Sequence, residues 1–185
     1  MIQLLPFTPE DFNQLINWIG NEKELIIWSG NLFNYPLNHE SLQWYISNTN
    51  DPETSDAFVY KAIDGTTGKV IGHISLGSIS RKNMSGRISR VLIGDQESRG
   101  KGYCRQMVEA VSDLGFGVLH LHRISLGVYT ANTAAISCYQ KAGYSIEGVH
   151  RDVLWNDGEW LSIVEMGMLQ QEWQVRNGME LSQQS

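Results

Sequence analysis

The spacing of hydrophobic residues along the chain changes period several times, and each change predicts an element. Residues 2–6 are typical of a short strand, and apolar side chains between Phe12 and Ile19 repeat at helical spacing. From Ala57 to Ser78 the pattern indicates two strands joined by a turn at Asp64–Gly68, which is a hairpin. A further apolar strand is predicted over 86–94.

The second half of the chain alternates helices and strands in the same way. The pattern predicts a helix from Tyr103 to Val118, a strand over 123–129, a helix over 132–142, and strands over 144–149 and 161–169. No linker or internal repeat interrupts this series. We therefore expect one domain of α+β class over residues 1–170, followed by a polar C-terminal tail over residues 171–185.

The segment between the first two predicted helices has two interpretations. Thr8-Pro9 is a helix start, and Asn38 is the candidate cap of a second helix. Between them, Gly20–Tyr35 is rich in aromatic residues and contains Gly30. It is either a loop that packs aromatic side chains onto the core or one wall of a substrate pocket.

Composition narrows the class of protein. The chain has 185 residues, 42% hydrophobic and 18% charged, which is typical of a folded globular domain. No apolar run approaches the roughly 18 residues of a membrane helix, and the N-terminus lacks the basic region of a signal peptide. These features predict a cytoplasmic protein with no membrane partner. The net charge of −6 argues against non-specific binding of nucleic acid and is compatible with a cationic substrate.

Neither the cysteines nor the histidines predict a metal site. Cys104 and Cys138 have no CxxC spacing and no matching His pair, so we expect neither a disulfide framework nor zinc, and interpret both as small, semi-apolar core residues. His120 and His122 have no third ligand in the sequence. We therefore expect no metal cofactor.

The stretch from Arg87 to Met107 is an apolar strand, a glycine-bearing loop and the start of a helix, an arrangement typical of phosphate binding. Residues 81–105 hold seven basic side chains, half of the chain's 14. A P-loop is excluded because Gly102, and not Ser or Thr, follows Lys101. A dinucleotide fingerprint is excluded because Arg105 stands at its third glycine.

The pattern that does fit is RxxGxG/A, present as Arg99-Gly-Lys-Gly-Tyr-Cys104. Together with Asn132-Thr-Ala-Ala-Ile-Ser-Cys-Tyr-Gln-Lys-Ala-Gly-Tyr144, it resembles the GCN5-related N-acetyltransferase (GNAT) family. The segments 147–152 and 157–160 are similar to the branch with ribosomal-protein alanine and polyamine acetyltransferases. The resemblance implies a single-domain GNAT fold, whose mixed central sheet splays at the acetyl-CoA site and carries helices on both faces.

The resemblance also implies which residues bind acetyl-CoA. The pyrophosphate would lie on the N–H groups of Arg99, Gly100, Lys101, Gly102, Tyr103 and Cys104. In the family the strand before this loop is bulged, and its amides bind the pantetheine and the thioester carbonyl. Val91, Leu92 and Ile93 are the matching positions, and we assign the amide that stabilises the oxyanion to Leu92.

Two downstream residues complete the implied site. Asn132 either only caps its helix or also contacts the cofactor, as the matching residue does in the family. Tyr139 is the implied general acid, because the departing CoA thiolate needs a proton and a phenol can donate it. Its alternative role is that of a core tyrosine.

The general base is where the sequence departs from the family pattern, since Ser89 stands where related enzymes often carry Glu. Water relays to Asp152, Glu159 or His150, or binding of an already neutral amine, are the alternatives. The leading hypothesis is an acetyl-CoA-dependent N-acetyltransferase acting on a protein N-terminus or a small amine, and a homodimer is compatible with it. The second is a CoA-binding or acyl-CoA-binding regulatory module without catalysis.

Overall fold

The computed structural model describes residues 1–179 and contains a seven-stranded sheet. The strands are β1 (Ile2–Pro6), β2 (Phe58–Asp64), β3 (Val70–Ser80), β4 (Ser85–Ile93), β5 (Arg123–Tyr129), β6 (Ser145–Asn156) and β7 (Glu159–Leu169). The α-helices are α1 (Phe12–Trp18), α2 (Glu22–Ser29), α3 (His39–Tyr45), α4 (Tyr103–Asp113), α5 (Thr133–Lys141) and α6 (Gln170–Arg176). Short 3₁₀ turns cover Pro9–Asp11 and Gln96–Ser98, and a π-helical turn covers Leu114–Val118.

The strands lie in the order β1-β2-β3-β4-β5-β7-β6, and β4–β5 is the parallel pair among otherwise antiparallel neighbours. Helix α4 connects these two strands, as a parallel connection requires. The pairing of β4 with β5 runs only from Ser85 to Ile88 on β4. Among residues 1–179, the last five residues of β4 therefore have β3 on one side and no strand partner on the other, and the predicted splayed sheet is confirmed.

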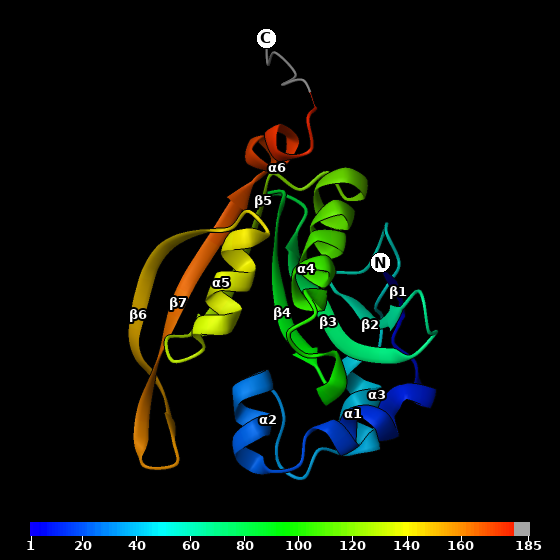
Figure 1. The fold of residues 1–185 in the computed structure, drawn as a ribbon, viewed down its shortest axis with the longest axis vertical. Helices are drawn as coiled ribbons and strands as arrows, with labels where there is room; N and C mark the ends of the chain where they lie inside the picture. The colour runs from blue at the N-terminus through cyan, green and yellow to red at the C-terminus, as the bar shows by residue number, and fades with distance from the viewer. Residues whose placement is uncertain (180–185) are drawn as a thin grey trace.

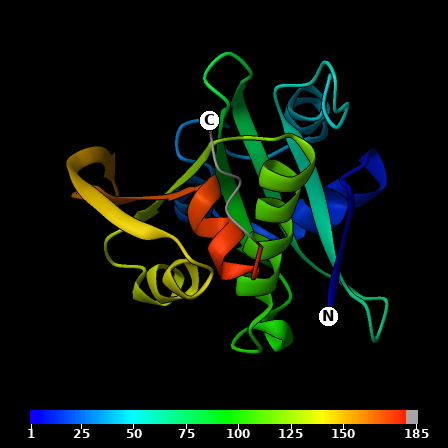
Figure 2. The same ribbon diagram turned by 90° about the horizontal axis from the view of Figure 1, so that it is seen from above.

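Two hydrophobic cores hold the sheet between helices (Figures 1 and 2). One core packs α4, α5 and α6 against one face and includes Met107, Val111 and Tyr144. The other packs α1, α2 and α3 against the opposite face near β1–β4 and includes Phe12 and Leu25. The α+β class with helices on both faces, as predicted, is confirmed.

The segment with two interpretations contains a helix. Asn21 caps α2, because its side-chain oxygen accepts a hydrogen bond from the Glu24 N–H at 2.9 Å. Trp28, on the last turn of α2, donates its indole N–H to the carbonyl oxygen of Arg90 at 3.0 Å. The segment is therefore a helix fixed to β4 followed by a turn over residues 30–35, and its Trp28 and Phe33 side chains pack on the second core, as the first interpretation predicted.

Residues 171–176 of the predicted polar tail belong instead to α6, which begins at Gln170. Trp173 of α6 is only 8% exposed and belongs to the core under α4. Its indole N–H donates to Asp113 Oδ1 at 2.8 Å. One aromatic residue thus extends the packed domain beyond the predicted boundary, while residues 180–185 of that tail lie outside the described part of the chain.

The cysteines also differ from expectation, because Cys104 and Cys138 form a disulfide between α4 and α5. The sequence did not predict this pair, since the two residues are 34 positions apart and come together only when both helices pack on the sheet. Within residues 1–179, no group of three or more potential metal ligands comes together. No helix in this range is long and apolar enough to cross a membrane.

Candidate active site

The unpaired edge of β4 presents backbone amides to the space between β4 and β5. Gly94, just after β4, donates its N–H to the Ile71 carbonyl of β3 at 3.0 Å. Alternate residues of an antiparallel strand direct their N–H groups to the same neighbour. The N–H of Leu92 therefore faces β3, and the N–H of Ile93 faces the side from which β5 has separated. The ladder favours Ile93 over Leu92, the sequence-based choice, as the amide available to a ligand.

A bulge in β4 lies next to this edge. The register with β3 shifts between His73 and Ser75, and Arg90 has a φ of 54°. This is the left-handed region, which residues other than glycine rarely adopt. Val91, directly after the bulge, packs its side chain against the core on the α4 side. The strand thus has the predicted bulge, and the side chain of Val91 is core while its backbone lines the edge.

The loop after β4 leaves several amides without partners. Arg99 donates its N–H to the Gln96 carbonyl at 3.2 Å, so this amide is not free, contrary to the expectation. Within residues 1–179, the N–H groups of Gly100, Lys101 and Gly102 meet no acceptor. Gly100 and Gly102 have φ values of 74° and 80°, a conformation that favours glycine. The glycines turn these amides to the outside, where an anion can reach them.

The start of α4 differs from the starts of α2, α3 and α5. Asn21, Asn38 and Asn132 accept hydrogen bonds from the first turns of α2, α3 and α5. The first turn of α4, which includes Tyr103 and Cys104, has no side-chain cap. The first amides of a helix have no partner inside the helix and carry its positive dipole end. Helix α4 therefore directs the unpaired amides of its first turn toward the same place as the amides of the loop.

The basic cluster predicted from residues 81–105 divides in the structure. Arg87 forms an ion pair with Glu165 of β7, and Arg105 pairs with Glu109 at 2.8 Å. Arg99 and Lys101 flank the loop, and no carboxylate of residues 1–179 lies within 4.0 Å of either side chain. These two cations remain available to the phosphates of a ligand.

Tyr139 of α5 lies mostly inside the core on the α4 side, with 6% of its surface exposed. Burial raises the pKa of its phenol to about 12. The hydroxyl is therefore protonated at neutral pH, the state that a proton donor needs. Its neighbour Cys138 is joined to Cys104, so a covalent bond connects the helix that carries Tyr139 to the first turn of α4.

Asn132 caps α5, a role that both of its sequence-based interpretations include. Its side-chain oxygen accepts from the Ala135 N–H at 3.1 Å. Gly143 follows the other end of α5 with a φ of 104°, a conformation typical of a C′ glycine. Contact of Asn132 with a cofactor stays a prediction.

On the opposite face of β4, α2 and α3 place an aromatic and polar group of residues that sequence reasoning did not single out. His73 of β3 lies with its ring centroid 5.4 Å from that of Trp28 and 5.9 Å from that of Tyr45. The guanidinium carbon of Arg90 lies 5.3 Å from the centroid of the Tyr45 ring. In the sequence, α2 has one local signal, which is the Asn21 cap followed by acidic residues in the first turn. No local signal indicates that His73, Tyr45 and Arg90 come together in the fold.

Ser89 is engaged with other polar groups and has no carboxylate beside it. Its hydroxyl lies 3.1 Å from that of Ser75 and accepts a hydrogen bond from Arg90 Nη1 at 2.6 Å. Asp152, Glu159 and His150, the candidate relay ends, lie on the β6–β7 hairpin and are exposed. Ser89 thus sits beside a cation, where the family pattern has an acid.

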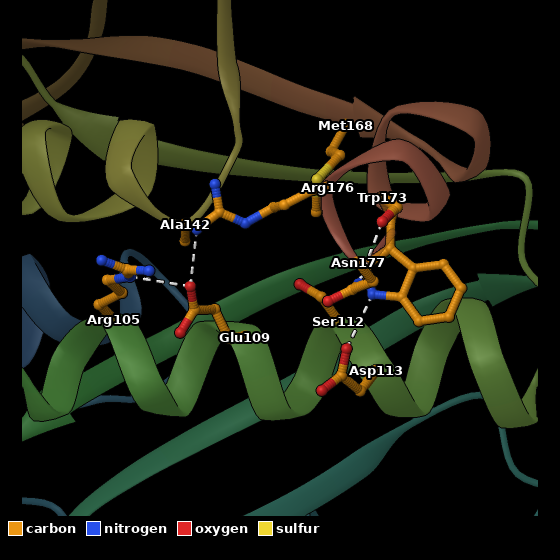
Figure 3. Close-up of a pocket in the computed structure, with 9 residues that line it drawn as sticks. All are labelled: Arg105, Glu109, Ser112, Asp113, Ala142, Met168, Trp173, Arg176 and Asn177. Atoms are coloured by element: carbon orange, nitrogen blue, oxygen red, sulfur yellow. Dashed lines mark hydrogen bonds and ion pairs between the residues drawn. The ribbon is translucent and has the colours of Figure 1, made fainter. Parts of the chain in front are cut away.

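A separate groove of about 380 Å³ lies along α4, between this helix and α6 (Figure 3). None of the predicted cofactor-binding residues lines it. Glu109 in this groove accepts from both Arg105 and Arg176 at 2.8 Å, so its charges pair with one another. We interpret the groove as the seam where α6 docks on α4, and not as the active site.

Comparisons with known proteins agree with this geometry. A family model described as acetyltransferase (GNAT) domain matches residues 2–145. The probable N-acetyltransferase YjcK of Bacillus subtilis is 31% identical over 111 residues, covering 58% of this chain and 59% of the relative. Spermidine N(1)-acetyltransferase of Vibrio cholerae is 25% identical over 115 residues, covering 62% and 65%. The chain thus spans about 60 to 65% of the length of these two relatives.

Among solved structures, spermidine N-acetyltransferase from Vibrio cholerae in complex with CoA and spermine superposes with a TM-score of 0.79. It is 20% identical, and the match covers 93% of this chain and 97% of that one. The splayed mixed sheet of this chain, with α4 starting at its opening, is therefore the fold of an acetyltransferase. The chain belongs to the GNAT acetyltransferase family, and the resemblance to the branch with polyamine acetyltransferases is confirmed.

Proposed function

We propose that this protein transfers the acetyl group of acetyl-CoA to the nitrogen of a small primary amine. The observation that carries the proposal is the uncapped start of α4 beside the loop amides of Gly100, Lys101 and Gly102. These donors suit the pyrophosphate of CoA, because the positive end of a helix and free backbone amides together favour an anion. Arg99 and Lys101 add positive charge at the same place.

The strand edge would hold the reacting end of the same ligand. With the pyrophosphate on the loop, the pantetheine arm lies along the unpaired side of β4, which ends beside the bulge at Arg90. The N–H of Ile93 is then the donor for the thioester carbonyl. One such donor aimed at a developing oxyanion contributes roughly 3 kcal/mol to lowering the barrier.

The transfer is written as a direct displacement. The free amine attacks the thioester carbon, a C–N bond forms, and the carbonyl oxygen becomes the oxyanion held by Ile93. When the oxygen re-forms its double bond, the C–S bond breaks and CoA leaves as a thiolate. Tyr139 gives its proton to the thiolate, and the proton lost by the new amide nitrogen restores the phenol through water. The products are an N-acetylamine and CoA thiol.

The acceptor must arrive as the free amine, because an ammonium has no lone pair for attack. Ser89 is hydrogen-bonded to Arg90 and Ser75, so we give it no role as a base. The positive guanidinium beside Ser89 disfavours a second cation in its neighbourhood. This favours loss of the ammonium proton to water as the acceptor binds. Of the alternatives given in the sequence analysis, it corresponds to reaction of a neutral amine without a general base.

The test measures release of CoA thiol from acetyl-CoA with N-terminal peptides, amino acids, polyamines and simple amines, with mass spectrometry of each product. We expect an N-acetylated product with at least one small amine, at a rate well above that of hydrolysis. Binding of CoA with no acetylated product from any acceptor would contradict the proposal and support the regulatory module instead. That alternative has no structural observation in its favour beyond Ser89.

We further propose a homodimer, on the basis of exposed apolar side chains on the β6–β7 hairpin. Five large hydrophobic residues there are 44 to 57% exposed, namely Ile146, Val149, Val153, Trp155 and Trp160. Large exposed apolar side chains gathered on one hairpin are typical of an interface. Light scattering after gel filtration should give twice the chain mass of 20.9 kDa, and a monomer at micromolar concentration would contradict the proposal.

A further inference from the structure

Arg90 holds a positive charge that the described chain leaves without a counter-charge. No carboxylate of residues 1–179 lies within 4.0 Å of its guanidinium, whereas Arg87, three residues earlier on β4, pairs with Glu165. The side chain is partly buried, and its Nε atom is fully buried with no hydrogen-bond partner. A partly buried cation without an anion is unfavourable unless a ligand supplies one.

The groups around Arg90 carry no charge that could replace the missing anion. Burial raises the pKa of Tyr45 to about 12, so its phenol is neutral at pH 7. Burial also lowers the pKa of His73 to about 4, so its imidazole is neutral as well. His73 Nδ1 lies 3.1 Å from the Arg90 carbonyl, which can only accept, so this nitrogen carries the proton.

Three unpartnered polar atoms gather at this point. Besides Arg90 Nε, the hydroxyl of Tyr45 and the Nε2 of His73 are buried and make no hydrogen bond within the described chain. Two of these atoms, the guanidinium N–H and the phenol, are donors. Buried polar atoms without partners are rare in native proteins, and these three are closed to a ligand because they are fully buried. Arg90 Nη2 makes no hydrogen bond within the described chain and is not among the fully buried atoms, so it is the donor that a carboxylate oxygen can reach.

The position of Arg90 puts this charge at the acceptor side of the transfer site. It is the bulge residue of β4, directly before Val91 and three residues before Ile93. At roughly 3.3 Å per residue, the backbone of Arg90 therefore lies within about 10 Å of the amide assigned to the thioester carbonyl. Helix α2 is fixed below the same place, because Trp28 donates to the Arg90 carbonyl and the Tyr129 hydroxyl lies 3.5 Å from the Ile26 carbonyl (Figure 1).

The acids around α2 do not offer the opposite charge pattern. Glu24 accepts from the Gly20 N–H at 2.8 Å, and Asp157 of the β6–β7 turn pairs with Lys23 at 3.1 Å. Glu22 is exposed at the start of the helix. The charge carried by β4 itself, at Arg90, is thus positive, and a polyamine, which carries only positive charges, would be repelled from it.

We propose that Arg90 binds a carboxylate of the acceptor, so that the substrate is an amino acid or a similar small amine with a carboxylate close to the nitrogen. This inference rests on the proposed function and names its substrate class. The guanidinium offers the fork that a carboxylate fits with two hydrogen bonds. The Tyr45 ring, packed against the guanidinium, holds the fork in place.

The same contact explains how the site works without a nearby acid at Ser89. An amino acid bound through its carboxylate brings its ammonium close to the Arg90 charge. A like charge within a few ångströms lowers the pKa of an ammonium and favours the free amine that attacks the thioester. The carboxylate of the acceptor therefore supplies the counter-charge of Arg90, and the Arg90 charge favours release of the proton from the acceptor ammonium.

The test compares amino acids with amines of the same side chain that lack the carboxylate. Methionine is paired with 3-(methylthio)propylamine, phenylalanine with 2-phenylethylamine and lysine with cadaverine, and spermidine is added. We expect kcat/KM for the amino acid to exceed that of its amine by about 10- to 100-fold, the range of a charge-assisted contact. Arg90→Gln should bring the ratio close to one, and Arg90→Lys should keep part of it.

Two controls separate this effect from changes in fold or overall charge. Lys82→Gln removes one exposed positive charge at the β3–β4 turn, far from the site, and should leave the ratio unchanged. In Arg90→Gln, the affinity for CoA should equal that of the unaltered protein, which shows that the variant is folded and that its cofactor site is intact. Equal or better turnover of cadaverine and spermidine in the unaltered protein would overturn the carboxylate site while leaving the acetyltransferase function in place.

A binding measurement covers the case of no turnover. Calorimetry with the CoA complex and methionine should show binding that Arg90→Gln weakens about 10-fold or more. If methionine binds in this way but no acceptor is acetylated, the carboxylate site holds and the proposed function is wrong. If methionine binds equally well to both proteins, Arg90 is not the carboxylate site.

Discussion

The two faces of β4 achieve recognition by different means. On the α4 side the chain offers backbone amides, released by Gly100 and Gly102 and by a helix start without a cap. On the α2 side it offers side chains, with Arg90 and Tyr45 brought together from different elements. Backbone recognition suits the CoA part, which is the same for every acceptor, while side-chain recognition can change with the substrate.

Because of this difference, the α4 side tolerates few sequence changes, whereas the side chains of the α2 side can be exchanged more freely. An amide is presented by the conformation of the loop, so few sequences satisfy it. A side-chain site needs only suitable groups at positions that the fold already provides. The predictions below test whether the two faces are as separate as this comparison holds, beginning with the largest expected effect.

Gly102→Val should abolish most CoA binding. A β-branched residue at a φ of 80° is strained, and the loop would turn its amides away from the pyrophosphate. With two charge-assisted hydrogen bonds lost at about 1.5 to 3 kcal/mol each, we expect affinity for CoA to fall about 1,000-fold. Calorimetric titration with CoA measures this directly.

The chain contains a matched control for this variant. Gly68, in the β2–β3 turn, has a φ of 72°, and a Cβ there would meet no atom within 4 Å, as at Gly102. Gly68→Val should therefore carry a similar folding cost without loss of CoA affinity. Undiminished CoA binding in a folded Gly102→Val protein would mean that the loop is not the pyrophosphate site.

The loop and the order of elements could be predicted because their signals are local. Gly100, Gly102 and the apolar strand before them occupy one short stretch, and Gly143 marks the end of α5 by itself. The family pattern also supplied Tyr139 and Asn132 as positions in one segment. Features that depend on the backbone conformation of a few neighbouring residues can therefore be predicted from the sequence.

The α2 side could not be predicted because its contacts join residues far apart in the chain. Arg90 and Tyr45 are separated by 45 positions, and nothing local to either residue indicates that a ring will lie on the guanidinium. The same is true of Cys104 and Cys138, and of Trp173, whose partner Asp113 lies 60 positions away. The choice of Leu92 over Ile93 depended on strand register, which only the pairing with β3 decides.

The disulfide connects α4 and α5, two of the three helices on the α4 side, and should stabilise that side most. A cross-link spanning 34 residues is expected to contribute about 4 kcal/mol to the free energy of unfolding. Urea denaturation with and without a reductant measures the loss. A Cys104→Ser, Cys138→Ser double variant should match the reduced protein and show no response to the reductant. Equal stability of the oxidised and reduced protein would remove the cross-link as a stabilising element.

Tyr139→Phe should lower kcat about 100-fold while CoA affinity changes little, because a proton donor acts only in the transition state. Tyr144→Phe is the matched control, since its hydroxyl lies 2.8 Å from that of Ser112 inside the core. It should cost stability but leave kcat near that of the unaltered protein. Thiol release under saturating acetyl-CoA gives kcat, and an unchanged kcat in Tyr139→Phe would exclude the phenol as general acid.

The raised pKa of Tyr139 gives this variant a second, pH-dependent readout. The phenol titrates near pH 10 when unfolded and near 12 when folded. A raised pKa in the folded state stabilises the fold fully below pH 10, and the contribution is lost as the pH rises from 10 to 12. It amounts to about 2 to 3 kcal/mol. Urea denaturation at pH 8 and pH 11.5 should show a smaller alkaline loss of stability in Tyr139→Phe; an equal loss would contradict the buried phenol.

The smallest expected effect decides between the two roles of Asn132. Asn132→Ala removes the cap on Ala135 and should lower the free energy of unfolding by about 1 kcal/mol, whereas Asn132→Ser keeps a capping oxygen. If Asn132 also contacts CoA, the Ser variant recovers stability but binds CoA more weakly than the unaltered protein, about 5-fold for one neutral hydrogen bond. That outcome is the one we expect, since α5 begins where β5 has parted from β4. Full recovery of both properties would leave Asn132 as a cap alone, and CoA recognition would then rest on the backbone of the α4 loop without help from this side chain.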